Sequence, residues 1–244
     1  MIRNQFMSHN SEAKDKIKWR SHEPHRIEAF SDGVFAFAVS LLIISLEVPH
    51  SAKELFEMMK GFFPFCICFS LVFFIWYSQY KFFRQYGLHD IPTILLNGAL
   101  LFLVLFYVYP LKFMVNLAAT AGRAAYKIDP DDFVPMMRLY NSGFTGIFLL
   151  FTLMYYNAYK QREELALTPV EVFETRTNVL FYLYMTSVGM VTVLLALAGG
   201  RIAGFSMAGY GLMGGLGIVS HNRNKRFHKK FGEVPQVEPH LGSD

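Results

Sequence analysis

Long apolar segments constrain the fold of this 244-residue chain more than any other feature. A helix needs about 20 consecutive apolar residues to cross the hydrocarbon core of a bilayer, and several windows reach that length. Residues 98–109, for example, contain no charged side chain. The hydrophobic residues, 53% of the chain with 25 Phe, are concentrated in these segments. The pattern predicts an all-α, multi-pass protein of the cell (inner) membrane.

Charged and proline-containing segments divide the apolar sequence into predicted membrane spans. The six spans are residues 29–48, 61–83, 93–116, 141–159, 178–198 and 202–219. A short amphipathic connector is expected at 51–60 and the longest connector at 117–140. Two segments are typical helix starts: Asp90-Ile91-Pro92, and Thr168-Pro169-Val170-Glu171, which matches a capping box. No internal repeat is evident, so we expect a single six-helix repeat.

The distribution of Lys and Arg predicts the orientation of the spans. Basic residues near the span ends are far more numerous on the side that carries both termini. Cytoplasmic loops carry the excess of Lys and Arg, so both termini are expected in the cytoplasm. The predicted divisions are a polar cytoplasmic segment at 1–24, a transmembrane domain at 25–220 and a basic cytoplasmic tail at 221–244. The first 28 residues lack an apolar core, so no cleavable signal peptide is expected.

Several classes of protein fit the sequence poorly. The net charge of +4 comes from basic residues that flank membrane segments, with no aromatic-basic module for nucleic acid. The 8 His lie outside the spans or at their ends, without the clustered ligands or acid–base groups of an enzyme site. Cys66 and Cys68 point apart on a helix and cannot bridge one another. We therefore expect no enzyme activity, no cofactor and no nucleic-acid partner.

Asp32 is the most unusual residue of the first predicted span. A carboxylate at the edge of the hydrocarbon is costly and usually faces protein or water. Arg26, at the membrane edge, is expected to neutralise part of its charge. Hydrogen-bond donors on the second and third spans are the predicted partners of this segment. These donors are Trp76, Ser78, Gln79 and Asn97.

A second face of the same helix carries Phe37, Ser40 and Ile44, which fall within roughly 60° of each other on the helical period. Phe30, Gly33 and Leu41 lie on or beside this stripe, whereas Asp32 is roughly 115° from its centre. Such a stripe usually means lipid contact or helix packing, and a serine in a membrane helix usually bonds its own i−4 carbonyl. Periodicity alone therefore favours packing over a pore.

The first span also carries a long motif: Arg26-xxx-Phe30-Ser31-Asp32, then residues 33–42, then Leu46-Glu47-Val48-Pro49. It resembles the signature of the lysosomal potassium channel family (transmembrane protein 175), in its prokaryotic, bacterial branch. Residues 76–83 and 97–111 resemble the second and third spans of that family more loosely. The resemblance implies a homotetramer around a central pore lined by the first helix. It also implies passive potassium conduction with a modest preference over sodium.

The resemblance assigns roles to individual residues. Ser40 corresponds to a hydroxyl layer that is generally Thr, and a potassium ion is expected transiently beside it. Ile44 and Phe37 take the places of aliphatic residues one turn outward and one turn inward, where the pore is constricted. The signature residues and their polar partners form the packing network behind the pore: Arg26, Phe30, Ser31, Asp32, Trp76, Ser78, Gln79 and Asn97. Gln79-Tyr80 stands where many prokaryotic members have two histidines.

Two other functions stay open at this point. A secondary transporter of a cation or small solute would show inverted repeats and helices broken at mid-membrane. No repeat is visible, although the glycine-rich segment 202–219 is a candidate broken helix. A structural membrane protein that conducts nothing is also compatible with the sequence.

Overall fold

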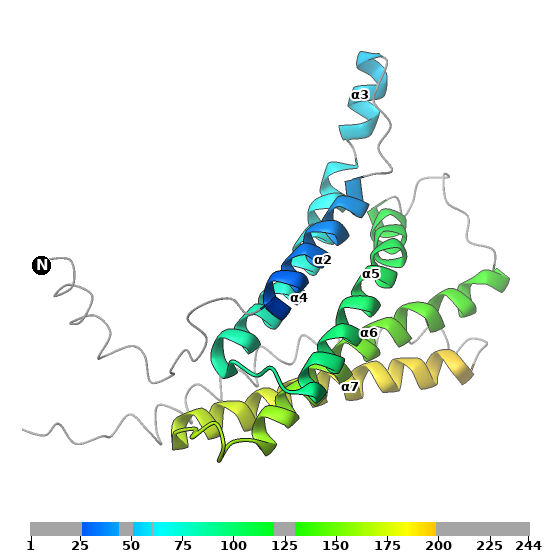
Figure 1. Cartoon of the computed structure of the whole chain (residues 1–244). Coiled ribbons are helices and arrows are strands. Elements are labelled where there is room, and N and C mark those ends of the chain that lie inside the picture. Colours follow the sequence, from blue (N-terminus) through cyan, green and yellow to red (C-terminus); the bar gives the residue numbers. More distant parts are fainter. Residues whose placement is uncertain (1–25, 44–50, 60, 120–129, 199–244) are drawn as a thin grey trace, which may run out of the picture.

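A computed structural model describes residues 26–43, 51–59, 61–119 and 130–198 (Figure 1). Within these ranges all regular secondary structure is helical. The helices, labelled as in Figure 1, are α2 (Arg26–Ile43), α3 (Ala52–Met59), α4 (Phe62–Tyr86), α5 (Ile91–Ala119), α6 (Pro130–Lys160) and α7 (Pro169–Ala198). The all-α class predicted from the apolar segments is therefore confirmed for the part of the chain that the structure describes.

The five long helices form two groups. Helix α2 packs against both α4 and α5, and α5 packs in turn against α6. Helices α6 and α7 form a closely packed antiparallel pair that crosses below the first group, while α3 stands apart at the top of the view (Figure 1). We call the end of the bundle at which α2 begins the Arg26 end, and the opposite end the Ile43 end. Successive long helices alternate in direction between these two ends.

Both predicted helix starts are confirmed. At the start of α7 the backbone N–H of Thr168 donates to Glu171 Oε2 over 2.8 Å, and the N–H of Glu171 donates to Thr168 Oγ1 over 3.3 Å. This reciprocal pair is a capping box, with Pro169 as the first helical residue. At the start of α5 the hydroxyl of Thr93 donates to the Asp90 carboxylate over 2.6 Å. The capping box at Thr168 thus satisfies backbone donors that α7 itself leaves unpaired.

The Asp90 carboxylate also connects α5 to α6. Asn157 Nδ2 donates to Asp90 Oδ2 over 3.0 Å. Burial by itself would raise the pKa of Asp90, but hydrogen bonds from Thr93, Asn157 and Gln161 outweigh it and lower the pKa below its usual value. The carboxylate therefore stays charged at neutral pH and holds the Arg26 ends of the two helices together.

The predicted connector at 117–140 is wrong over much of its length. Helix α5 continues to Ala119, and α6 already begins at Pro130, eleven residues before the predicted start at 141. The physical reason lies in the polar run that suggested a loop. Pro130 suits the first helical position, and acidic residues in the first turn interact favourably with the helix dipole. Asp132 supplies such a charge.

Three of the described helices are long and apolar enough to cross a membrane: α4, the segment Ile91–Val115 of α5, and α7. The described part of α2 carries Arg26, Glu28 and Asp32, which reduces its apolar character. Helix α6 carries several polar side chains, including Asn141, Thr145 and Thr152. The multi-pass architecture is clear, whereas the predicted sixth span at 202–219 lies outside the described residues, so the count of six stays a prediction.

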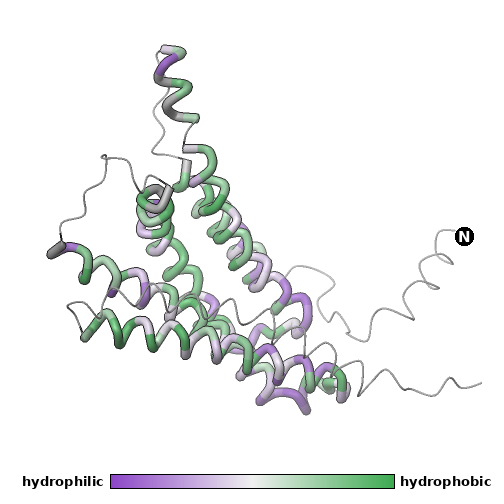
Figure 2. The backbone as a smooth tube through the Cα atoms, turned by 180° about the vertical axis from the view of Figure 1, so that it is seen from behind, coloured by the Kyte–Doolittle hydropathy of each residue, from purple (hydrophilic) through white to green (hydrophobic). Residues whose placement is uncertain are grey.

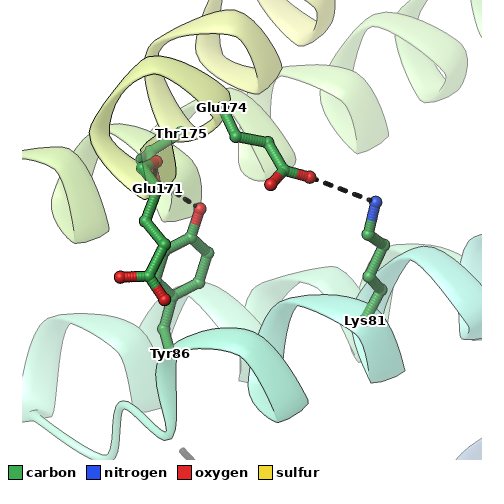
Figure 3. Close-up of polar contacts among 5 residues, drawn as sticks. All are labelled: Lys81, Tyr86, Glu171, Glu174 and Thr175. Carbon is green, nitrogen blue, oxygen red and sulfur yellow. Dashed lines mark hydrogen bonds and ion pairs between the residues drawn. The ribbon is translucent and has the colours of Figure 1, made fainter. Parts of the chain in front are cut away.

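Polar residues gather at the Arg26 end of the bundle. Hydrophilic segments lie where α4 passes into α5 and where α6 passes into α7, whereas the helices between are largely hydrophobic (Figure 2). There Lys81 Nζ of α4 lies 3.7 Å from Glu174 Oε1 of α7, and the hydroxyls of Tyr86 and Thr175 are 2.8 Å apart (Figure 3). These contacts fix the base of α4, the helix that supports α2.

Candidate pore helix and its polar supports

Helix α2 has one covered face and one uncovered face. Ser31, Phe35, Ala38 and Leu42 are buried against the neighbouring helices. The opposite side forms a stripe at helical spacing, and its members are all exposed. The uncovered stripe consists of Arg26, Ala29, Phe30, Gly33, Ala36, Phe37 and Ser40. Within a single chain, the described part of the predicted pore face, with Phe37 and Ser40, is therefore largely uncovered.

A buried hydrogen-bond chain holds the covered face. Gln79 Nε2 of α4 donates to Asn97 Oδ1 of α5 over 2.8 Å. Asn97 Nδ2 then donates to Ser31 Oγ of α2 over 2.9 Å, and the Ser31 hydroxyl donates to the Ile27 carbonyl over 2.7 Å. Gln79, Asn97 and Ser31 are each at most 2% exposed. Three helices are thus joined by directional bonds among side chains that would be costly to leave unpaired.

Asp32 has a separate partner. Trp76 Nε1 of α4 donates to Asp32 Oδ1 over 2.7 Å. Of the other three predicted donors, Asn97 donates to Ser31 and Gln79 donates to Asn97. The Ser78 hydroxyl donates to the Phe74 carbonyl of its own helix over 2.9 Å. Among the described residues Arg26 forms no ion pair with Asp32. The predicted network therefore divides into two parts, one around Ser31 and one around Asp32.

We predict that Asn97→Leu destabilises the protein by about 1–3 kcal/mol, because it leaves Gln79 and Ser31 buried without their shared partner. The measurement is the thermal unfolding midpoint in detergent. Ser70→Ala is the matched control, since it removes an exposed hydroxyl that bonds only the Cys66 carbonyl of its own helix. Equal midpoints for the two variants would contradict a stabilising role for the Asn97 bonds.

Ser40 and Phe37 lie together on the uncovered stripe. The Ser40 hydroxyl donates to the Ala36 carbonyl over 3.0 Å, as expected of a serine in a membrane helix. This bond uses the only proton of the hydroxyl and leaves its oxygen lone pairs as acceptors. The Phe37 side chain is 55% exposed, and a Cβ added at Gly33 would meet nothing within 4 Å. The third predicted pore residue, Ile44, lies outside the described residues.

The Ile43 end of α2 is tied to α5 as well. Lys112 Nζ donates to the Leu42 carbonyl over 2.6 Å. One residue earlier in α5, the Leu111 carbonyl lies 4.0 Å from Cys68 Sγ of α4, and Tyr140 of α6 donates its hydroxyl to the Pro110 carbonyl over 2.5 Å. Lys112 is not among the predicted site residues, because its acceptor is a backbone carbonyl that carries no sequence signal.

The described ranges contain no group of three or more His, Cys, Asp or Glu positioned to hold a metal ion. The helices do form a multi-pass membrane protein in which one face of α2 is packed against α4 and α5 and the opposite face is largely uncovered within a single chain. That arrangement is typical of a subunit that completes its working surface with other copies, as channel subunits do.

Comparisons with known proteins agree with this class. The sequence profile of the family described as "Endosomal/lysosomal potassium channel TMEM175" matches residues 26–107. A potassium channel of Marivirga tractuosa is 38% identical over 192 residues, which cover 74% of this chain and 78% of that relative. The chain belongs to the TMEM175 potassium channel family, as the resemblance of the first predicted span predicts, and this family is not a family of enzymes.

Two further relatives are informative. A potassium channel of Chamaesiphon minutus is 32% identical over 146 residues, or 57% of this chain and 65% of that protein. The crystal structure of the potassium channel MtTMEM175, solved as a threonine-to-alanine variant with a nanobody fusion protein, superposes with a TM-score of 0.77. The two chains are 34% identical, and the superposition covers 87% of this chain and 98% of the solved chain. A location in the cell membrane is consistent with these bacterial relatives.

Proposed function

We propose that this chain is a potassium-permeable cation channel that conducts passively through a pore lined by α2 in a homotetramer. The observation that carries the proposal is the division of α2 into two faces. Buried hydrogen bonds hold one face against α4 and α5, and the other face is an uncovered stripe that contains Ser40 and Phe37. Family membership and relatives described as potassium channels support conduction of potassium.

Ser40 is the proposed ion ligand. Oxygen atoms can replace part of the hydration shell of an ion in a selectivity filter. Because the Ser40 proton is engaged with the Ala36 carbonyl, the hydroxyl oxygen is free to face a cation with its lone pairs. Four such hydroxyls and the water between them form a weaker site than stacked rings of carbonyls. We therefore expect only a modest preference for potassium over sodium.

Phe37 and Ile44 are the proposed constriction, since apolar rings in a pore can gate by losing their water. The signature residues Arg26, Phe30, Ser31 and Asp32 act with their partners Trp76, Ser78, Gln79 and Asn97 as the support of the pore helix. We further propose the cytoplasmic location of both termini and the division into segments 1–24, 25–220 and 221–244. The excess of basic residues near the terminal side supports this orientation.

The direct test is cation flux in liposomes that contain the purified protein. We expect potassium to move down its gradient, with a smaller flux under an equal sodium gradient, and no flux in protein-free liposomes. Flux that saturates, is coupled to protons and accumulates the solute against its gradient would instead indicate a secondary transporter. Absence of any cation flux from correctly assembled protein would refute the channel proposal.

A further inference from the structure

The uncovered stripe of α2 has two unlike edges. On a wheel with about 100° per residue and Ser40 as the origin, Phe37 and Phe30 lie about 60° and 80° to one side. Ala29 and Ala36 lie about 20° and 40° to the other side. We call Phe30 and Phe37 the aromatic edge, and Ala29 and Ala36 the small edge. Gly33 and Ser40 run between them.

The small edge is bordered by α4. Asp32 lies about 80° from Ser40 on the same side, and its bond to Trp76 marks where α4 meets this side of α2. Trp76 belongs to a row of rings along α4 that we call the aromatic ladder: Phe69, Phe73, Trp76 and Tyr80. Successive ring centroids of the ladder are 6.1, 5.2 and 5.6 Å apart. Short side chains on α2 therefore lie next to a row of rings on α4, of which Phe69, Phe73 and Tyr80 are exposed and Trp76 is half-buried.

The aromatic edge lacks such a cover. Phe30 is 65% exposed and Phe37 is 55% exposed. Within the described ranges, the residues beyond them, Val34 and Leu41, are only partly buried in the core of their own chain. One side of α2 thus projects two large rings that contact little, while the other side offers small residues that let a second helix approach closely.

A second copy of this chain fits both edges at once. Rotation about a central axis brings the aromatic edge of each copy to the small edge of the next, and such head-to-tail contacts close into a ring. Lipid is a poor occupant of the small edge, because the exposed Asp32 carboxylate lies beside it and carboxylates in membrane helices usually face protein or water. Water would leave the rings of Phe30 and Phe37 exposed, so a protein neighbour narrow enough to leave the axis open fits both edges better.

We infer that in the assembled channel Phe30 and Phe37 of each copy pack over Ala29 and Ala36 of its neighbour, against the aromatic ladder of that neighbour. The inference rests on the proposed function and adds the seam between pore helices. It places Gly33 and Ser40 nearest the axis. Phe37 borders the pore from the side and seals the gap through which water and ions would otherwise leak between subunits.

Disulfide trapping tests the seam. In a background with Cys66→Ala and Cys68→Ala, the double variant Ala36→Cys/Phe37→Cys carries one thiol on each edge. Adjacent side chains on a helix point apart, so the two thiols cannot bridge within one chain. If the small edge meets the aromatic edge, each copy is joined to both neighbours. Oxidation of membranes with copper phenanthroline should then give a covalent tetramer on a non-reducing gel, reversed by reductant.

The single variants define the background of this experiment. Each copy with one thiol can form only one disulfide, so Ala36→Cys or Phe37→Cys alone gives dimers at most. Phe30→Cys/Phe37→Cys is the matched control, with two thiols on the same edge, and should likewise stop at dimers. If Ala36→Cys/Phe37→Cys also stops at dimers although the unoxidised protein is tetrameric, the seam is wrong. Potassium flux from the Cys66→Ala/Cys68→Ala background protein, which keeps Ala36 and Phe37, then shows that the proposed function survives.

A photoreactive side chain at position 37 tests the seam without removing the ring. Phe37→benzoylphenylalanine keeps an aromatic group on the edge and inserts into C–H bonds on illumination. We expect adducts between two chains, with the attachment mapped by mass spectrometry to peptides that contain the small edge or the aromatic ladder. Attachment only to lipid, or only within one chain, would overturn the inference.

Discussion

Replacement of Asp32 by Ala is expected to abolish most cation flux, by at least about tenfold, through loss of the assembled or open channel. The free energy that corresponds to a tenfold change is smaller than the stabilisation that one hydrogen bond to a charged group typically contributes. The Asp32 carboxylate accepts from Trp76 Nε1 over 2.7 Å, and that bond fixes the rotation of α2 relative to α4. The flux that remains should keep the potassium preference of the wild type, because Ser40 is unchanged.

Asp32→Asn is the matched control for this prediction. The amide keeps an oxygen that accepts from Trp76 but loses the charge, so we expect an intact tetramer and partial flux. Native mass spectrometry reports assembly, and flux measurements in liposomes report conduction. An Asp32→Ala protein with wild-type currents and an unchanged tetramer would show that this carboxylate does not support the pore helix.

The two polar parts behind α2 explain why we expect different consequences from their variants. The bonds around Ser31 are fully buried and connect three helices, so their loss lowers stability. The Asp32 bond lies at the edge of the uncovered stripe, next to the proposed contact with another copy. We therefore expect loss of the Asp32 bond to alter the surface through which copies assemble more than it alters the fold of one chain.

Local signals in the sequence predicted much of the fold. The capping box at Thr168 and Glu171 and the helix start at Asp90 both form as predicted, because their partners lie within one helical turn. The start of α6 at Pro130 was missed because a polar run with three acidic residues resembles a loop, although proline and acids are equally typical of a first helical turn.

Contacts between helices could be predicted only in outline. The donors Trp76, Gln79 and Asn97 could be chosen from their polarity, but which of them meets Asp32 and which meets Ser31 depends on the rotation and crossing of α4 and α5. Lys112 binds the Leu42 carbonyl, and every residue has such a carbonyl, so no pattern marks the acceptor. The unlike edges of the stripe also emerge only once burial shows which residues of α2 are uncovered.

Phe37→Ala is expected to enlarge the single-channel current several-fold and to loosen the preference for potassium over sodium. The ring is the largest side chain within one turn of Ser40 on the uncovered stripe, and an apolar ring in a pore resists wetting. Removal of the ring widens the path beside the hydroxyl layer. Ions then keep more of their hydration water and interact less strongly with the Ser40 oxygens. Current recordings in planar bilayers under mixed potassium and sodium give both quantities.

Phe102→Ala separates this effect from a general response to losing a surface ring. Phe102 is 72% exposed and belongs to α5, not to the proposed pore helix α2, so we expect its removal to leave current and selectivity unchanged. Because the Phe37 ring also packs in the proposed seam, the recordings must be paired with the oligomeric state. A larger current from an intact tetramer assigns Phe37 to the conduction path, whereas no change at Phe37 or at Ile44 would argue against a pore on this face of α2.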